Sequence, residues 1–120
     1  MASTMLIVAI TLDLTIWSFG QLDIQVNKPP VIDVRSPTEG EINQTVIINA
    51  SILDPDGNLT SIIWNQEDEF GPVAMNISQD KQSMSFIPTR NVTHVFSIEA
   101  IDNNGSATLE SVQVNIGPMN

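Results

Sequence analysis

The amino-acid sequence predicts an all-β fold, an antiparallel sandwich of seven strands that follows a short hydrophobic N-terminal segment. Three observations lead to this fold class. After Pro29, short runs with an apolar residue at every second position alternate with segments rich in proline, glycine, asparagine and aspartate. No long run in this region has the helical period of about 3.6 residues. Without its hydrophobic start the chain has about 100 residues, the usual size of one two-sheet sandwich.

Each expected strand is bounded by residues that favour turns. Two prolines precede the first strand, and Ser36-Pro37 follows it. The sequence DPDG at 54–57 predicts a tight turn, because proline fixes φ and glycine accepts a positive φ. A second turn, DNNG at 102–105, leads into the last strand. The seven strands are expected at residues 31–35, 45–53, 59–65, 73–77, 83–87, 92–101 and 107–116.

The alternation within the longer strands assigns them an inward face. These residues are expected to form one hydrophobic core between two facing sheets. Trp64 and Phe96 are interpreted as packing residues that bury large apolar areas, and His94 as a core histidine with satisfied ring nitrogens. The inward residues are Val46, Ile48, Ala50, Ile52, Ile62, Trp64, Val92, His94, Phe96, Ile98, Ala100, Val112, Val114 and Ile116.

The N-terminal segment, residues 1–20, has three interpretations. It is apolar up to Phe19, and Ser18 and Gly20 fit the small-residue rule for a signal peptide cleaved before Gln21. A retained membrane-anchor helix over 4–19 is the second interpretation, although Asp13 would be costly in lipid. The third is a strand donated to a neighbouring subunit, because apolar residues fall on even positions. All three place the sandwich, 31–117, outside the cytoplasm, with 21–30 as a linker or first strand.

The charge of the chain excludes some partners. Four basic residues stand against 14 acidic ones, which gives a formal net charge of −10. A nucleic-acid-binding protein needs clustered lysine and arginine to displace counterions from phosphates, and an anionic lipid surface would repel this chain. There is no cysteine, so neither disulfides nor thiolate metal sites are expected. The sequence therefore predicts a self-repelling surface that binds no nucleic acid.

Three stretches, NKPPVIDVRSP, VIINASILDPDGNLTSIIW and HVFSIEAIDNNGSATLESVQVNI, lie between residues 27 and 116. Together they resemble the polycystic-kidney-disease (PKD) type domain and its immunoglobulin-like and cadherin-like relatives, surface modules of archaea and bacteria. The most specific parts are DPDG before a strand that ends in Trp64, and Asp102 before Asn-Asn-Gly. The sequence departs from the family at His94, usually an aromatic residue, and at NQED (65–68), often a Gly-Asp-Gly turn. The resemblance implies an immunoglobulin-like sandwich used in adhesion, spacing or assembly.

Six asparagines fit the N-glycosylation pattern, in which any residue but proline and then serine or threonine follow. Chance predicts about 2 from the composition of the chain. Each of the six lies in an expected turn, at a strand end or on the outward face of a strand, as a bulky glycan requires. Occupied acceptors would favour an archaeal or eukaryotic source over an ordinary bacterium. They are Asn43, Asn49, Asn58, Asn76, Asn91 and Asn104.

Catalytic chemistry has no support in the sequence, and no catalytic or cofactor-binding residue is assigned. The single histidine is expected in the core, and the acidic run Glu67-Asp68-Glu69 is expected to be solvated. Calcium is the one ion considered. The loops 54–58 and 102–105 should emerge at the same end of the sandwich and bring Asp54, Asp56 and Asp102 together. The alternative is that these side chains only shape their own turns.

These observations predict a non-catalytic, extracytoplasmic subunit of a cell-surface assembly, such as a surface layer, a filament or a membrane complex. Its partners would be other protein subunits, including copies of itself. A calcium- or carbohydrate-dependent adhesion module is the alternative. That alternative needs an exposed aromatic platform or a formed calcium site.

Overall fold

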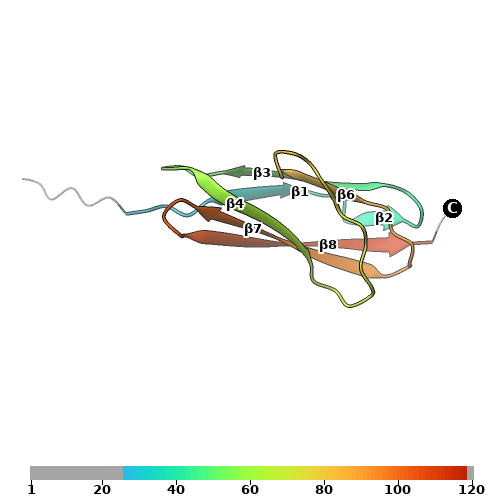
Figure 1. Cartoon of the computed structure of the whole chain (residues 1–120). Coiled ribbons are helices and arrows are strands. Elements are labelled where there is room, and N and C mark those ends of the chain that lie inside the picture. The colour runs from blue at the N-terminus through green and yellow to red at the C-terminus, as the bar shows by residue number, and fades with distance from the viewer. Residues whose placement is uncertain (1–25, 119–120) are drawn as a thin grey trace, which may run out of the picture.

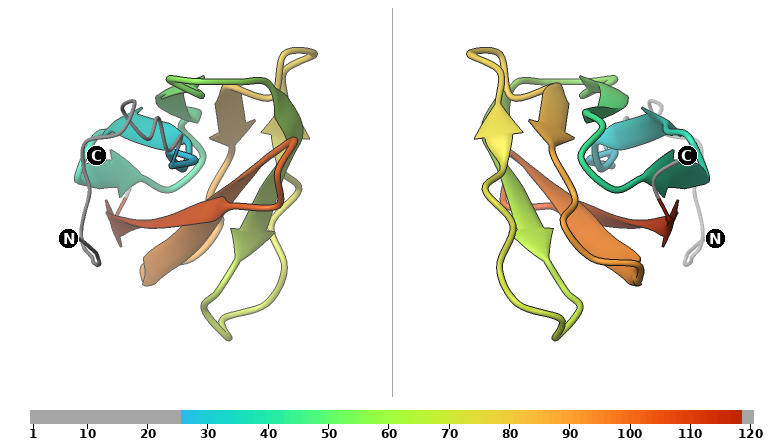
Figure 2. Two further views of the ribbon diagram at one scale, coloured as in Figure 1. Left: turned by 90° about the vertical axis from the view of Figure 1, so that its left-hand side faces the viewer. Right: turned by 90° about the vertical axis from the view of Figure 1, so that its right-hand side faces the viewer.

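The computed structural model describes residues 26–118, which form two packed four-stranded sheets (Figures 1 and 2). The described part of the chain is all β and contains no helix. The eight strands are β1 (Val31–Arg35), β2 (Glu39–Glu41), β3 (Val46–Leu53), β4 (Leu59–Gln66), β5 (Asn76–Ile77), β6 (Ser83–Phe86), β7 (Thr93–Asp102) and β8 (Ala107–Gly117).

The two sheets have the strand orders β1-β3-β6-β5 and β2-β8-β7-β4. Neighbouring strands are antiparallel except β2, which runs parallel to the end of β8. Strand β2 was not predicted, and the expected strand 73–77 is shorter than predicted, since only Asn76 and Ile77 pair with β6. The sequence Glu-Gly-Glu of β2 has no apolar alternation from which a strand could be inferred.

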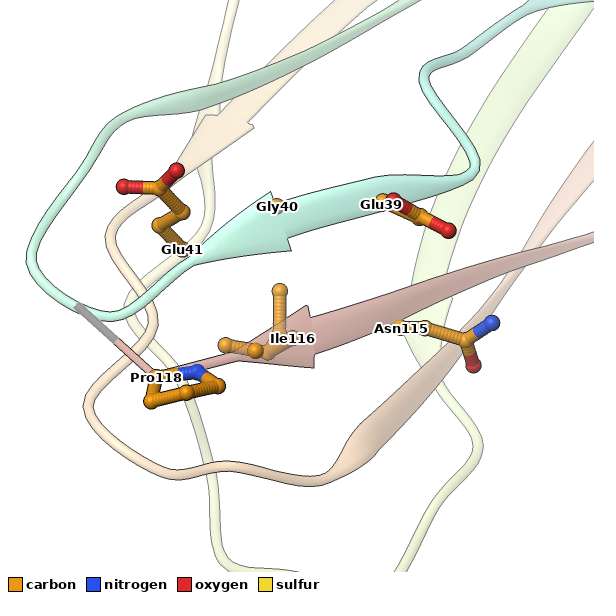
Figure 3. A pocket seen from close by; sticks show the side chains of 7 residues that line it. Glu39, Gly40, Glu41, Asn115, Ile116 and Pro118 are labelled. Carbon is orange, nitrogen blue, oxygen red and sulfur yellow. The ribbon is translucent and has the colours of Figure 1, made fainter. Parts of the chain in front are cut away.

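Strand β2 lies against β8 because Gly40 has no side chain. A Cβ atom at Gly40 would lie 2.8 Å from Val46 Cγ2 and 3.1 Å from Ile116 Cδ1. Figure 3 shows the hollow beside these two strands, in which Ile116 points from β8 towards β2. The main-chain bonds Asn115 N–H to Thr38 O (2.9 Å) and Ile42 N–H to Gly117 O (3.2 Å) bracket the parallel pair. The short strand thus extends the second sheet at this end.

The core lies between the sheets and contains the residues that the alternation predicted. All the predicted inward residues are buried except Ile62 and Val92, which are half-buried. Strand β3 alternates strictly between buried and exposed positions. Trp64 links the two sheets, because its indole N–H donates to the main-chain oxygen of Lys81, in the turn between β5 and β6 of the first sheet (2.8 Å). The two-layer prediction is therefore confirmed.

The described chain enters at one end of the sandwich and leaves at the other (Figure 1). Residue 27 is bonded to the β7–β8 turn, whereas Gly117 lies at the opposite end, beside the segment that precedes β3. The hydrophobic segment 1–20, with its three interpretations, and the first half of the linker, residues 21–25, lie outside the described residues. Within residues 26–118 no helix has the length and apolarity needed to cross a membrane.

Candidate functional sites

The three aspartates proposed for calcium lie near one another, at the end of the sandwich where the described chain enters. Asp102 is buried, and its Oδ1 accepts hydrogen bonds from the backbone N–H groups of Asn104 (2.9 Å) and Ser106 (2.8 Å). Its Oδ2 accepts a bond from the Asn27 side chain (2.9 Å). The Asn27 bond, followed by the backbone bonds, lowers the pKa of Asp102. Asp102 therefore shapes the β7–β8 turn and also holds the incoming linker.

Asp56 and Asp54 differ in their bonding. Asp56 Oδ2 accepts a hydrogen bond from the backbone N–H of Lys28 (2.8 Å), so it also holds the linker. Both carboxylate oxygens of Asp54 are shielded from solvent, and neither accepts a hydrogen bond of good geometry within residues 26–118. Burial raises the pKa of Asp54, and the nearby carboxylates of Asp56 and Asp102 add to this rise. Within residues 26–118, Asp54 is thus a shielded carboxylate that accepts no well-aligned hydrogen bond and whose closest charged neighbours are the acids Asp56 and Asp102.

The side-chain oxygen of Asn103, in the loop 102–105, lies close to Asp54. Asn103 Oδ1 and Asp54 Oδ2 are 2.8 Å and 2.9 Å from the position that a Cβ atom on Gly57 would occupy. Glycine at 57 therefore lets the loops 54–58 and 102–105 approach each other. Even so, no three His, Asp or Glu side chains within residues 26–118 converge closely enough to hold a metal ion by themselves. The calcium site stays a prediction that would need ligands from amides and backbone carbonyls.

The acidic run 67–69 is not simply solvated, and this expectation was wrong for Asp68. The Asp68 side chain is only 4% exposed and lies against β7. Its Oδ2 accepts bonds from the backbone N–H of Val95 (2.8 Å) and from His94 Nδ1 (3.0 Å). Its Oδ1 accepts bonds from the Gln66 side chain (2.9 Å) and the Phe70 N–H (3.1 Å). The aspartate fastens the loop after β4 to the adjacent strand.

The hydrogen bonds to Asp68 lower its pKa by more than burial raises it. Burial alone would raise the pKa, but the bonds from Val95, Gln66, Phe70 and His94 lower the pKa of Asp68 from 3.8 to about 2. Glu67 is also engaged, because Ser97 Oγ donates to its carboxylate (2.6 Å). The sequence contained one indication of this arrangement. His94 was expected in the core, and a buried imidazole needs an acceptor for its N–H, which a nearby acid can supply.

His94 is buried as predicted, with 1% exposure, but within residues 26–118 only one of its two ring nitrogens has a hydrogen-bond partner. Because ionised Asp68 only accepts hydrogen bonds, His94 Nδ1 carries the proton of the pair. Nε2 has no partner within the described residues. The ring also lines a small hollow with Phe70, Pro72 and Arg90, whose guanidinium donates to the Phe70 carbonyl (2.7 Å). The imidazole packs edge-on against Phe86. This is the environment of a structural histidine.

The six glycosylation acceptors are all exposed, as the sequence predicted. Asn49 and Asn76 lie on β3 and β5 of the first sheet. Asn58 and Asn104 lie in the turns at the end where the chain enters, and Asn43 and Asn91 lie in loops at the other end. Asn104 also donates from its side chain to Asn27 Oδ1 (2.9 Å). The exposure is compatible with modification, and occupancy of the acceptors stays a prediction.

Comparisons with known proteins identify the fold. No protein-family model and no curated protein matches the sequence. Among solved structures, the PKD1 domain of Vibrio anguillarum Epp is 19% identical with a TM-score of 0.56, over 78% of this chain and 100% of that domain. The PKD domain of an M14-like peptidase from a Thermoplasmatales archaeon is 22% identical with a TM-score of 0.55, over 77% of this chain and 99% of that domain.

A longer protein contains the same fold. The SrpA adhesin of Streptococcus sanguinis is 13% identical with a TM-score of 0.59, over 80% of this chain. The present chain spans only 60% of that adhesin structure. At such identities the likeness concerns the backbone alone. The chain is therefore a β-sandwich domain with the fold of PKD and immunoglobulin-like modules.

Proposed function

We propose that this domain is a non-catalytic interaction module on the outer side of a cell membrane, where it serves as a subunit of a surface assembly. The proposal draws support from the path of the chain through the sandwich. Asn27 is bonded to the β7–β8 turn and Gly117 to the segment before β3, at opposite ends of the described domain, so the two ends of the described chain are separated by the length of the sandwich (Figure 1). The PKD and adhesin structures show the same arrangement of sheets.

The attachment of the incoming linker is the observation that carries the proposal. Asn27 bonds to Asp102 and to Ser106 Oγ (2.6 Å), and the Lys28 N–H bonds to Asp56. Together with the bond from the Asn104 side chain to Asn27 Oδ1, four hydrogen bonds hold residues 27 and 28 against the loops at this end of the sandwich. A module that presents a surface to neighbours in an assembly needs such an attachment, since each freely rotating joint adds an entropic cost to binding.

Surface labelling of intact cells tests the proposed location. Lys28 and Lys81 are exposed, so a membrane-impermeant amine reagent should modify both when the full chain is present in its own cells. Mass spectrometry of the two lysine-containing peptides reads the result, and an abundant cytoplasmic protein serves as the unlabelled control. Native electrophoresis of the same cells should show the chain in a complex larger than 13.1 kDa. Labelling that requires cell lysis, or migration as a free monomer, contradicts the proposal.

Calcium binding is the second candidate function. It is favoured by the shielded oxygens of Asp54, which accept no well-aligned hydrogen bond within residues 26–118. Calcium takes oxygen ligands in flexible geometry, and Asp54 Oδ2 and Asn103 Oδ1 approach one point from two loops. We expect calcium at 100 times its dissociation constant to stabilise the domain by about 2.7 kcal/mol. Calorimetric titration and thermal melts measure this effect, which Asp54→Asn should abolish and Asp33→Asn on β1 should leave intact. No heat of binding and an unchanged melting temperature would eliminate calcium.

A further inference from the structure

The outward side of the second sheet carries exposed apolar residues beside polar ones. The surface consists of the outward residues of β4, β7 and β8, and we call it the β4–β7–β8 face. In its central row Ile63 pairs with Glu99, and Glu99 pairs with Leu109. Ile63 is 39% exposed and Leu109 is 65% exposed. The next row places half-buried Ile101 between Ser61 and Ala107. The row on the other side of Glu99 is polar and consists of Asn65, Ser97 and Ser111. The Glu99 carboxylate therefore has apolar neighbours within its own row and on one side, and polar neighbours on the other side.

The glycosylation acceptors avoid this face. Two of the six lie on the first sheet, and the other four lie in loops at the two ends of the sandwich. Within residues 26–118, none lies on β4, β7 or β8. A glycan occupies a large volume above its asparagine and prevents close packing there. The β4–β7–β8 face is thus the broad side of the described domain that a partner could approach whether or not the acceptors are occupied.

The charges on the face specify what it could bind. Glu99 is the charged residue among the outward positions of the three central rows, and Glu67 lies at their border, bonded to Ser97. The four basic residues of the chain lie on none of these strands. A carboxylate covered by a partner must be paired, because an unpaired buried charge costs several kcal/mol. The matching surface therefore combines a lysine or arginine with apolar side chains opposite the row of Ile63 and Leu109.

We infer that the β4–β7–β8 face docks a second, different protein, which places a basic residue opposite Glu99 and apolar side chains over Ile63 and Leu109. This inference rests on the proposed interaction function and specifies its binding surface. A second copy of the chain is a poor match. Two such faces would bring together only acidic charges, because no basic residue lies on β4, β7 or β8 to pair with Glu99. Arg35, on the outward side of the first sheet, lies beside the acceptor Asn49. Like-charge contacts in an interface cost several kcal/mol.

Site-specific photo-crosslinking in the cells that make the protein tests the inference. A benzophenone amino acid replaces Ile63 on the face or, as the matched control, Leu53 on the outward side of the first sheet, which is 53% exposed. We expect the probe at position 63 to give one discrete adduct with at least ten times the yield at position 53. The crosslinked partner should differ from this chain and carry a lysine or arginine near the linked peptide.

Charge reversal at Glu99 distinguishes a specific interface from a chance collision. Glu99→Lys should lower the adduct yield at least tenfold, Glu99→Gln should lower it less, and both variants should keep the wild-type melting temperature. Changing the partner's basic residue to glutamate should restore the adduct with Glu99→Lys. An adduct between two copies, equal yields from both faces, or indifference to Glu99→Lys overturns the inference. An adduct from position 53 alone overturns the docking face only, whereas no adduct from either position counts against the interaction function as well.

A single substitution also places a glycan acceptor on the face. Leu109→Asn creates the pattern Asn-Glu-Ser at 109–111. Once a mass increase shows that position 109 is modified, the adduct from position 63 should fall at least tenfold. Adding Ser111→Ala removes the acceptor pattern and should restore the adduct. An adduct that persists beside a glycan at 109 overturns the inference.

Discussion

Replacing Asp68 by alanine is expected to lower the free energy of unfolding by about 3 kcal/mol, because the largely buried His94 ring and the Val95 N–H would lose their acceptor and the loop after β4 would lose its attachment to β7. The Val95 and Phe70 N–H groups and the His94 ring all donate to this carboxylate. Urea unfolding of wild type and variant measures the change. Glu69→Ala is the matched control, since this neighbouring acid is exposed, and it should change stability by less than about 0.5 kcal/mol. An equal effect of the two substitutions would contradict the anchoring role of Asp68.

The same carboxylate predicts a pH dependence with a definite sign. Its pKa is about 2 in the folded protein against 3.8 as the usual value, so folding favours the ionised form. The resulting stabilisation, about 2 kcal/mol, is complete above pH 4 and disappears as the pH falls from 4 to 2. The stability difference between wild type and Asp68→Asn should therefore shrink over this range. A difference that stays constant from pH 5 to 2 would show that the carboxylate charge is not involved.

Truncating Phe96 to alanine is expected to have the largest effect in the core, a loss of about 3–5 kcal/mol. The ring is 0% exposed, and its centre lies 4.9 Å from that of Phe86 and 6.0 Å from that of His94. Removing it leaves a cavity between the sheets that the rigid strands cannot close. Phe70→Ala removes the same atoms from a side chain that is 44% exposed and should cost less than about 1 kcal/mol. Chemical denaturation measures both variants, and comparable losses would refute the central place of Phe96.

The longer strands were predictable because their stability comes from an alternation that any window of the sequence displays. Strand β3 shows this best, with Val46, Ile48 and Ala50 buried and the residues between them exposed. Strand β2 was not predictable, because it exists through its pairing with residues 115–117, about 75 positions later in the chain. The need for a glycine at position 40 is apparent only from the folded structure, in which Val46 and Ile116 occupy the space that a side chain would fill. Long-range pairing of short polar strands leaves no local signal.

The candidate sites were predictable to different degrees. The meeting of Asp54 with Asp102 followed from topology alone, because loops that leave a sandwich at one end lie together. The burial of Asp68 did not follow, since a run of three acids usually remains in solvent and only the folding of the loop over β7 removes the middle one from water. The grouping of Ile63, Glu99 and Leu109 required the strand register, which the sequence does not specify.

The parallel pairing of β2 with β8 has a mechanical consequence. Because the described chain enters and leaves at opposite ends, a pulling force transmitted through the domain runs along the strands (Figure 1). The main-chain bonds from Asn115 to Thr38 and from Ile42 to Gly117 would then be loaded together, in shear, rather than opened one after another. This three-residue strand acts as a clamp on the terminal strand, and a domain with such a clamp suits a position under tension between a cell and its surroundings.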